Sequence, residues 1–121
     1  MFHRTTSSVD GVAIAYSVSG TADTAIVFIH DGLADRSFWD GQHAPFSHNY
    51  RVIALDLAGH GESGRDRQKW GIAEFALDVL AVLDAERTPA PSSSAMRHRG
   101  HRGRVARQAV RRCGDWCRYP P

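Results

Sequence analysis

Cysteine is scarce in this chain of 121 residues, and that scarcity limits the chemistry that the sequence can support. Cys113 and Cys117 are separated by three residues, which is not the Cys-x-x-Cys spacing of redox and zinc motifs. His98 and His101 lie nearby, but the spacings of these four residues fit no standard metal-binding module. We therefore predict no metal site and no cofactor.

Long apolar runs are also absent. No stretch approaches the roughly 18 consecutive apolar residues that a membrane span needs. The segment from Met1 to Thr6 contains no apolar core of signal-peptide length. We therefore expect a cytoplasmic protein without a membrane partner, and its length allows one domain at most.

Charged residues are divided unevenly along the chain. Residues 1–86 hold 6 Lys and Arg against 12 Asp and Glu, a net charge of −6. Residues 87–121 hold 9 Arg against the single acid Asp115, a net charge of +8. This asymmetry indicates two segments of different origin or with different partners, and a segment rich in Arg can make nonspecific contacts with phosphates.

Short apolar segments alternate with turn signals in the first part of the chain. Asp10-Gly11 is a hairpin signal between two segments of loosely alternating pattern. Two later runs, Ala25 to Ile29 and Val52 to Leu55, are continuously apolar, which is typical of strands buried on both faces. The strands predicted from these patterns cover residues 3–8, 12–18, 25–30 and 51–56.

Two helices are predicted among these strands. A short helix is expected from Asp35 to about His43, and Pro45 would end it. Residues 70–85 carry a broad apolar face with a period of 3.6, and acidic residues such as Asp78 are assigned elsewhere on the helix. The predicted order is strand, strand, strand, helix, strand, helix. This is an α/β fold whose third and fourth strands lie parallel across a crossover helix.

Each buried strand runs directly into a turn that contains glycine. The first turn is His30-Asp31-Gly32-Leu33, and the second is Asp56-Leu57-Ala58-Gly59-His60-Gly61-Glu62-Ser63. Together the turns resemble those of the α/β-hydrolase family, in which strand–His-Gly-x and strand–Asp-x-x-Gly-His-Gly-x-Ser occur in this order. The resemblance covers about residues 5–86, and it implies a truncated α/β-hydrolase-like domain with part of the family's sheet.

The resemblance implies a role for the first turn. In the family, a backbone N–H just after the His-Gly pair helps to form the oxyanion hole. This donor corresponds to Gly32, with His30 and Leu33 beside it in an oxyanion-hole-like turn. Asp31 replaces the usual glycine and places a carboxylate near the proposed oxyanion.

The second turn is expected to be architectural. Gly59 and Gly61 allow positive φ, and His60 and Ser63 can bond to neighbouring main-chain groups. Ser63, His60 and Asp56 are not expected to form a catalytic triad. The side chains of a triad must converge, whereas residues within one eight-residue turn point in different directions.

No catalytic residue is transferred from the family. The nucleophile of an α/β-hydrolase follows an apolar strand, expected here at about residues 89–95, and its acid and His come later. His98, His101 and Asp115 do not match those positions. We therefore expect a fragment of the ester or acyl hydrolase lineage, whose family acts on small acyl substrates, and we expect it to be inactive by itself.

Residues 87–121 are predicted to form an Arg-rich, irregular tail. The segment from Thr88 to Ser94 has the composition of a linker, and the basic segment after it has too few apolar residues to offset its ordering entropy. Disorder is expected there, apart from a short helix at 104–112.

A shifted reading frame is a further hypothesis. Shifted codons for Pro91 to Met96 can encode three apolar residues followed by Gly-His, but then Ala or Glu occupies the nucleophile position.

Two alternatives stay open. Another chain could complete the catalytic site, which would restore hydrolase activity by complementation. Alternatively, the basic tail could bind nucleic acid or an anionic surface, although its Arg spacing without interleaved aromatics supports only nonspecific phosphate contact. The oligomeric state is not predicted.

Overall fold

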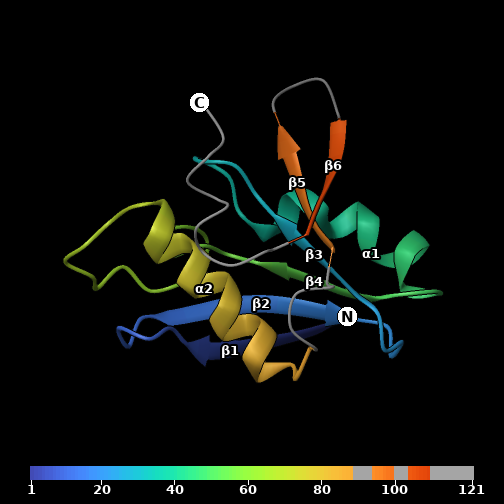
Figure 1. Cartoon of the computed structure of the whole chain (residues 1–121), viewed down its shortest axis with the longest axis horizontal. Helices are drawn as coiled ribbons and strands as arrows, with labels where there is room; N and C mark the ends of the chain where they lie inside the picture. The colour runs from blue at the N-terminus through green and yellow to red at the C-terminus, as the bar shows by residue number, and fades with distance from the viewer. Residues whose placement is uncertain (89–93, 100–103, 110–121) are drawn as a thin grey trace.

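A six-stranded sheet forms the centre of the computed structural model, which describes residues 1–88, 94–99 and 104–109 (Figure 1). Its strand order is β1-β2-β4-β3-β5-β6. The strands are Phe2–Ser7 (β1), Ala13–Ser19 (β2), Ala25–Ile29 (β3), Arg51–Leu55 (β4), Ser94–Arg99 (β5) and Arg104–Ala109 (β6). β1 and β2 form the predicted hairpin, and β3 pairs in parallel with β4. The predicted α/β arrangement of these strands is confirmed.

The helix α2 covers one face of the sheet. It spans Ile72–Ala85, close to the predicted segment 70–85. Val79, Val82 and Leu83 of this helix belong to the same buried cluster as side chains of β2, β3 and β4. The apolar period of the segment explains this packing, because it places these side chains on one side of the helix.

The opposite face is covered by a shorter helical segment. The 3-10 helix η1 spans Arg36–Trp39 and continues into α1, which spans Asp40–Ser47. Trp39 packs there against Phe28, with ring centroids 4.7 Å apart. The expected end at Pro45 is wrong, since this proline lies inside α1. A proline removes one backbone hydrogen bond, and the helix ends shortly afterwards.

Two strands lie in the segment that was expected to be irregular. β5 pairs in parallel with β3, with Arg97 opposite Ile29, and β6 pairs antiparallel with β5. Without a strand from the tail, β3 was expected to keep an unpaired edge, and a helix was expected at 104–112; β5 and β6 correct both predictions. Neighbouring strands pair through backbone N–H and C=O groups, which every residue except proline supplies. A polar segment can therefore form strands. Residues 89–93, 100–103 and 110–121 lie outside the described part, so irregularity there stays a prediction.

None of the helices in the described ranges is long and apolar enough to cross a membrane.

Candidate functional site

The carboxyl ends of β3 and β4 lie side by side at one edge of the sheet. Because the two strands are parallel, with Ile29 opposite Leu55, the turns that follow them leave the sheet together. These are the first turn, residues 30–33, and the second turn, residues 56–63. Ligands of parallel α/β sheets bind at this kind of edge.

His30 links the two turns. Its side chain is buried, and its Nε2 accepts a hydrogen bond from the backbone N–H of Leu57 at 3.0 Å. The ring proton therefore belongs on Nδ1, which donates to the carbonyl oxygen of Asp31 at 2.7 Å. Burial lowers the pKa of His30, which favours the neutral ring that these two bonds require. Both ring nitrogens are occupied, so His30 holds the turns together and does not offer a free base.

Gly32 and Leu33 present backbone donors at the same edge. The N–H of Ala34 donates to the carbonyl of Asp31 at 3.3 Å and closes the first turn. In the part of the chain that the structure describes, the amides of Gly32 and Leu33 have no hydrogen-bond partner. Leu33 has a φ of 65° and a fully exposed side chain. Two adjacent unpaired N–H groups are the type of donor that an oxyanion requires.

Asp56 fixes the second turn from inside. Its carboxylate is completely buried and accepts hydrogen bonds from the backbone N–H of Arg36 at 2.6 Å and of Glu62 at 2.9 Å. The guanidinium of Arg36 forms an ion pair with the same carboxylate. Sequence reasoning missed Arg36, because it lies 20 residues from Asp56 and no local spacing connects them.

Two glycines of the second turn have positive φ and leave no room for a side chain. Gly59 has a φ of 80°, and a Cβ atom there would lie 3.0 Å from the ring of Trp70. Gly61 has a φ of 49°, and a Cβ atom there would overlap the carboxylate of Asp56. The turn is therefore built closely around Asp56.

The polar side chains of the second turn bond to separate main-chain groups. The hydroxyl of Ser63 donates to the carbonyl of Asp56 at 2.6 Å and accepts from the N–H of Ala15 at 2.9 Å. Nδ1 of His60 lies 3.1 Å from the carbonyl oxygen of Ala58. These bonds occupy Ser63 and direct it toward β2, so the geometry gives no support to a triad in this turn.

Asp78 is buried, contrary to its predicted place off the apolar face of α2. Its carboxylate forms an ion pair with Arg67 at 2.6 Å and accepts from the hydroxyl of Ser8 at 2.8 Å. The N–H of Ala58 donates to it at 3.3 Å, which ties α2 to the second turn. A buried charge requires such partners. The partners come from three separate parts of the chain, so the helical pattern alone could not reveal them.

A pocket of about 190 Å³ opens beside the first turn. Its lining combines the end of β3, the two turns and α2: Ile29, His30, Asp31, Gly32, Leu57, Ile72, Phe75 and Val79. The wall is mainly apolar, and its polar groups are concentrated in the first turn. Such a combination suits a small ligand with an apolar body and a polar end.

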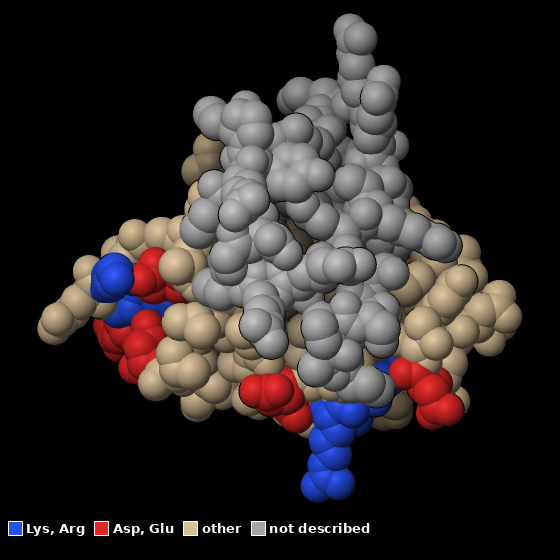
Figure 2. Space-filling view, in the orientation of Figure 1, with Lys and Arg blue, Asp and Glu red and all other residues tan. Residues whose placement is uncertain are grey.

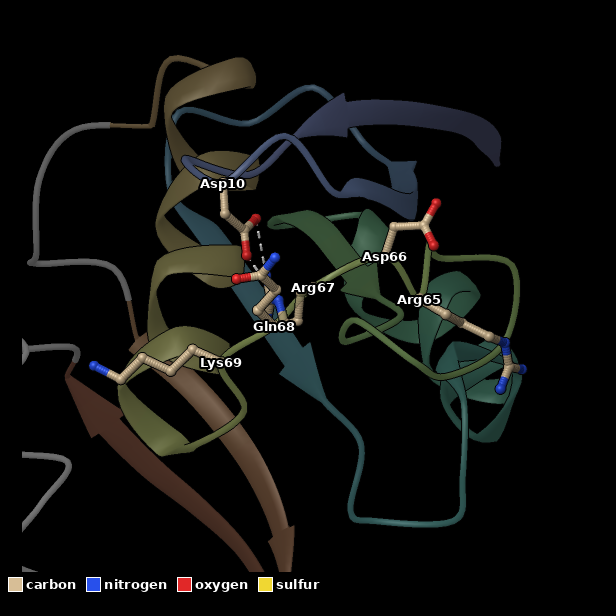
Figure 3. Close-up of a pocket in the computed structure, with 6 residues that line it drawn as sticks. All are labelled: Asp10, Arg65, Asp66, Arg67, Gln68 and Lys69. Carbon is tan, nitrogen blue, oxygen red and sulfur yellow. Dashed lines mark hydrogen bonds and ion pairs between the residues drawn. The ribbon is translucent and has the colours of Figure 1, made fainter.

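A larger hollow of about 660 Å³ lies along residues 65–69 and Asp10, away from the first turn (Figure 3). Arg67 points toward Asp10, and the two side chains form an ion pair at 2.9 Å. Arg65 and Lys69 extend in different directions (Figure 3). The hollow therefore does not bring catalytic groups together.

Charges on the described surface are mixed in sign. On the face shown in Figure 2, acidic and basic side chains lie close together. Ion pairs among the described residues, such as Arg4–Glu86 at 2.7 Å, neutralise part of the charge. Among the described residues, no group of three or more His, Cys, Asp or Glu is placed to hold a metal ion. His101, Cys113 and Cys117, whose spacings fit no standard metal-binding module, lie outside those residues.

Comparisons with known proteins agree with this architecture. A family model described as "Alpha/beta hydrolase family" matches residues 26–106, which extends beyond residue 86, where the resemblance of the motifs ended. An uncharacterised protein of Mycobacterium tuberculosis is 40% identical over 84 residues, which cover 66% of this chain and 24% of that protein. A 3-oxoadipate enol-lactonase of Acinetobacter baylyi is 34% identical over 91 residues, covering 74% of this chain and 34% of the lactonase.

Solved structures show the same likeness. An esterase from Rhodococcus is 36% identical with a TM-score of 0.70, and the match covers 78% of this chain and 35% of the esterase. An epoxide hydrolase from Acinetobacter nosocomialis, at 22% identity and a TM-score of 0.71, shares the fold. The chain spans about a quarter of the length of the first curated relatives that it matches.

Proposed function

The chain belongs to the alpha/beta hydrolase family, and we propose that its 121 residues supply an oxyanion donor and one wall of an acyl-binding pocket, without a complete catalytic site. The observation that carries this proposal is the pair of unpaired amides at Gly32 and Leu33 beside the 190 Å³ pocket. Similarity to an esterase and to a lactonase supports an acyl compound as the substrate class.

The side chains around the pocket support the absence of independent catalysis. His30 uses both ring nitrogens in hydrogen bonds to the main chain. Ser63 is buried, and its hydroxyl is held between two backbone groups. Neither group is therefore available as a nucleophile or a base.

A Ser–His contact does occur at the other end of the sheet. Ser19 lies 2.7 Å from Nδ1 of His43, but Ser19 pairs with Val52 near the start of β4. The pocket opens beyond the end of that strand, and neither residue lines it. This contact is therefore separated from the unpaired amides of the first turn.

Hydrolysis and labelling test the proposed inactivity directly. We expect the purified chain to hydrolyse p-nitrophenyl butyrate no faster than buffer, and we expect a serine-directed fluorophosphonate to label no residue. Labelling should be followed by intact-mass measurement, with Ser19→Ala and Ser63→Ala as matched variants. Stoichiometric labelling that one of these substitutions removes would identify a nucleophile and overturn the proposal.

The oxyanion donor needs a separate test, because inactivity alone does not establish it. Titration with methylphosphonate should shift the backbone amide resonances of Gly32 and Leu33 in ¹⁵N-resolved NMR spectra. Asp31→Gly should strengthen this response, since it removes a carboxylate next to the donors. If these two amides do not respond in either protein, the assigned role is wrong.

A second proposal concerns the basic tail. The net charge of +8 over residues 87–121 supports nonspecific binding to nucleic acid or another anionic surface. Binding to duplex DNA should weaken steeply with salt and should disappear in a chain ending at residue 88. Equal binding by both chains would contradict this proposal. Cytoplasmic location and completion of the site by another chain stay predictions.

A further inference from the structure

We propose that the 190 Å³ pocket prefers ligands with an aromatic ring next to the acyl carbon, such as a benzoyl group, over saturated rings of similar size. This inference rests on the proposed function, because it names the class of acyl group that the same pocket receives. It is carried by the rings that form the pocket wall and by those directly behind it.

Two of the residues that line the pocket carry flat rings, and they come from different elements. His30 lies at the end of β3, and Phe75 lies in the first turns of α2. A ligand ring in the pocket can therefore meet a π-system from the sheet and another from the helix. Apart from Asp31 and Gly32 in the first turn, the rest of the lining is aliphatic and accepts either kind of ring.

Further rings hold these two in place. His60 lies between them, with its ring centroid 4.8 Å from that of His30 and 6.2 Å from that of Phe75. The ring centroid of Trp70 lies 6.3 Å from that of Phe75. The four rings form a connected series from β3 to the start of α2. The centroid distances in this series are typical of favourable aromatic pairs. A ligand ring in the pocket would add one more such pair to the series.

The state of His30 is compatible with this role. Its Nε2 accepts from Leu57 and its Nδ1 donates to Asp31, so its edge is already bonded and its ring is held in one orientation. Burial lowers the pKa of this histidine, which keeps the ring uncharged near neutral pH. An uncharged, fixed imidazole offers a π-face without requiring a charged ligand.

The size of the pocket limits the ligand to about one ring and a carbonyl group. An apolar cavity of about 150 Å³ holds benzene, and this pocket of about 190 Å³ is slightly larger. The remaining space can accommodate a carbonyl group directed toward Gly32, which lines the same pocket. A long alkyl chain would exceed this volume.

Benzamide and cyclohexanecarboxamide provide a matched pair of probes. Both are neutral, both carry the same amide, and they differ in the aromaticity of the ring. Their affinities for the purified full chain can be compared by following pocket resonances in NMR titrations. We expect benzamide to bind about two- to tenfold more tightly.

Substitutions at the ring series locate the preference. Phe75→Leu should reduce the ratio of the two affinities to near one while retaining binding of cyclohexanecarboxamide. Trp70→Leu should reduce the ratio in part, and it is the safer variant because Trp70 is about half exposed. Phe38→Leu is the matched control, since Phe38 packs on Trp39 with centroids 5.1 Å apart and does not line the pocket.

Equal affinities in the unsubstituted chain, or no response of the pocket to either amide, would overturn the inference. A preference that Phe75→Leu and Trp70→Leu leave intact would overturn it as well. The methylphosphonate titration of Gly32 and Leu33 reports separately on the proposed function. Loss of the aromatic preference with an intact phosphonate response therefore refutes only this inference, whereas the reverse result refutes the oxyanion role.

Discussion

The two turns at the carboxyl edge of the sheet differ in how much of their polar surface is already bonded. In the second turn, Asp56 is completely buried and is bonded to Arg36 and Glu62. In the first turn, Gly32 and Leu33 are exposed, and their amides are unpaired within the described part of the chain. Both turns contain glycine and both follow a buried strand, so these sequence features do not distinguish them.

This difference separates an architectural turn from one that can receive a ligand. Backbone groups that are bonded internally are unavailable to a substrate, whereas exposed N–H groups can donate to one without breaking the fold. We therefore expect substitutions in the second turn to reduce stability strongly. Substitutions in the first turn should affect stability little and ligand binding more.

The largest effect is expected for Asp56→Asn. It removes the charge that neutralises Arg36, whose side chain is only 10% exposed. Breaking one side of a buried ion pair lowers the free energy of unfolding by about 3–5 kcal/mol. Urea denaturation followed by circular dichroism measures this loss.

Glu62→Gln is the matched control for that substitution. Glu62 bonds to the same guanidinium at 2.6 Å, but its side chain is 74% exposed. Its removal should leave the urea midpoint almost unchanged, since water replaces an exposed partner. Similar losses for both variants would show that burial of Asp56 is not what stabilises the second turn.

A pair of glycine substitutions compares the turns directly. Gly61→Ala should lower the free energy of unfolding by roughly 2 kcal/mol or more, because φ is positive and the new Cβ overlaps Asp56. Gly32→Ala should change it by less than about 0.5 kcal/mol, since a Cβ there meets open space. Equal effects in thermal or urea unfolding would contradict the contrast between the turns.

Stability should fall as the pH is lowered through the mildly acidic range. Burial lowers the pKa of His30 below its ordinary value of 6.5, so the unfolded chain binds protons that the folded chain does not. Each such group lowers the free energy of unfolding by up to about 1.4 kcal/mol per pH unit below pH ~6.5. The loss ends once the folded state also binds the proton.

His43 contributes in the same direction, because burial lowers its pKa as well. Urea unfolding at pH 5 and pH 7 should therefore show a smaller difference for His30→Gln, and the smallest for the variant that also carries His43→Gln. A pH difference that survives in the double variant would assign the effect to other groups.

The smallest effect is expected at Leu33, where φ is 65°. Leu33→Asn should raise the free energy of unfolding by about 0.5 kcal/mol, because Asn tolerates the left-handed conformation better than Leu. Leu33→Ala keeps the unfavourable conformation and should bring no gain. The difference between the two melting temperatures tests this explanation, and equal values would contradict it.

Local patterns in the sequence predicted much of this fold. β3 and β4 were predicted from continuous apolar runs, and α2 was predicted from its period of 3.6. The predictions failed where partners are distant. Asp78 was placed off the buried face because the pattern of α2 does not show that Arg67 and Ser8 would accompany it. The tail was expected to be irregular because its polar composition offers too little apolar surface to offset the ordering entropy, whereas β5 and β6 pair through backbone groups beside β3.

The sequence by itself determined the two buried strands, the main helix and the position of each turn, since these depend on the period of apolar residues and on nearby glycines. The tertiary structure alone decided that His30 joins the turns, that Arg36 neutralises Asp56, and that Gly32 faces a pocket. Hydrogen bonds and ion pairs act through space over a few ångströms. Their partners can be far apart along the chain, so no local pattern specifies them.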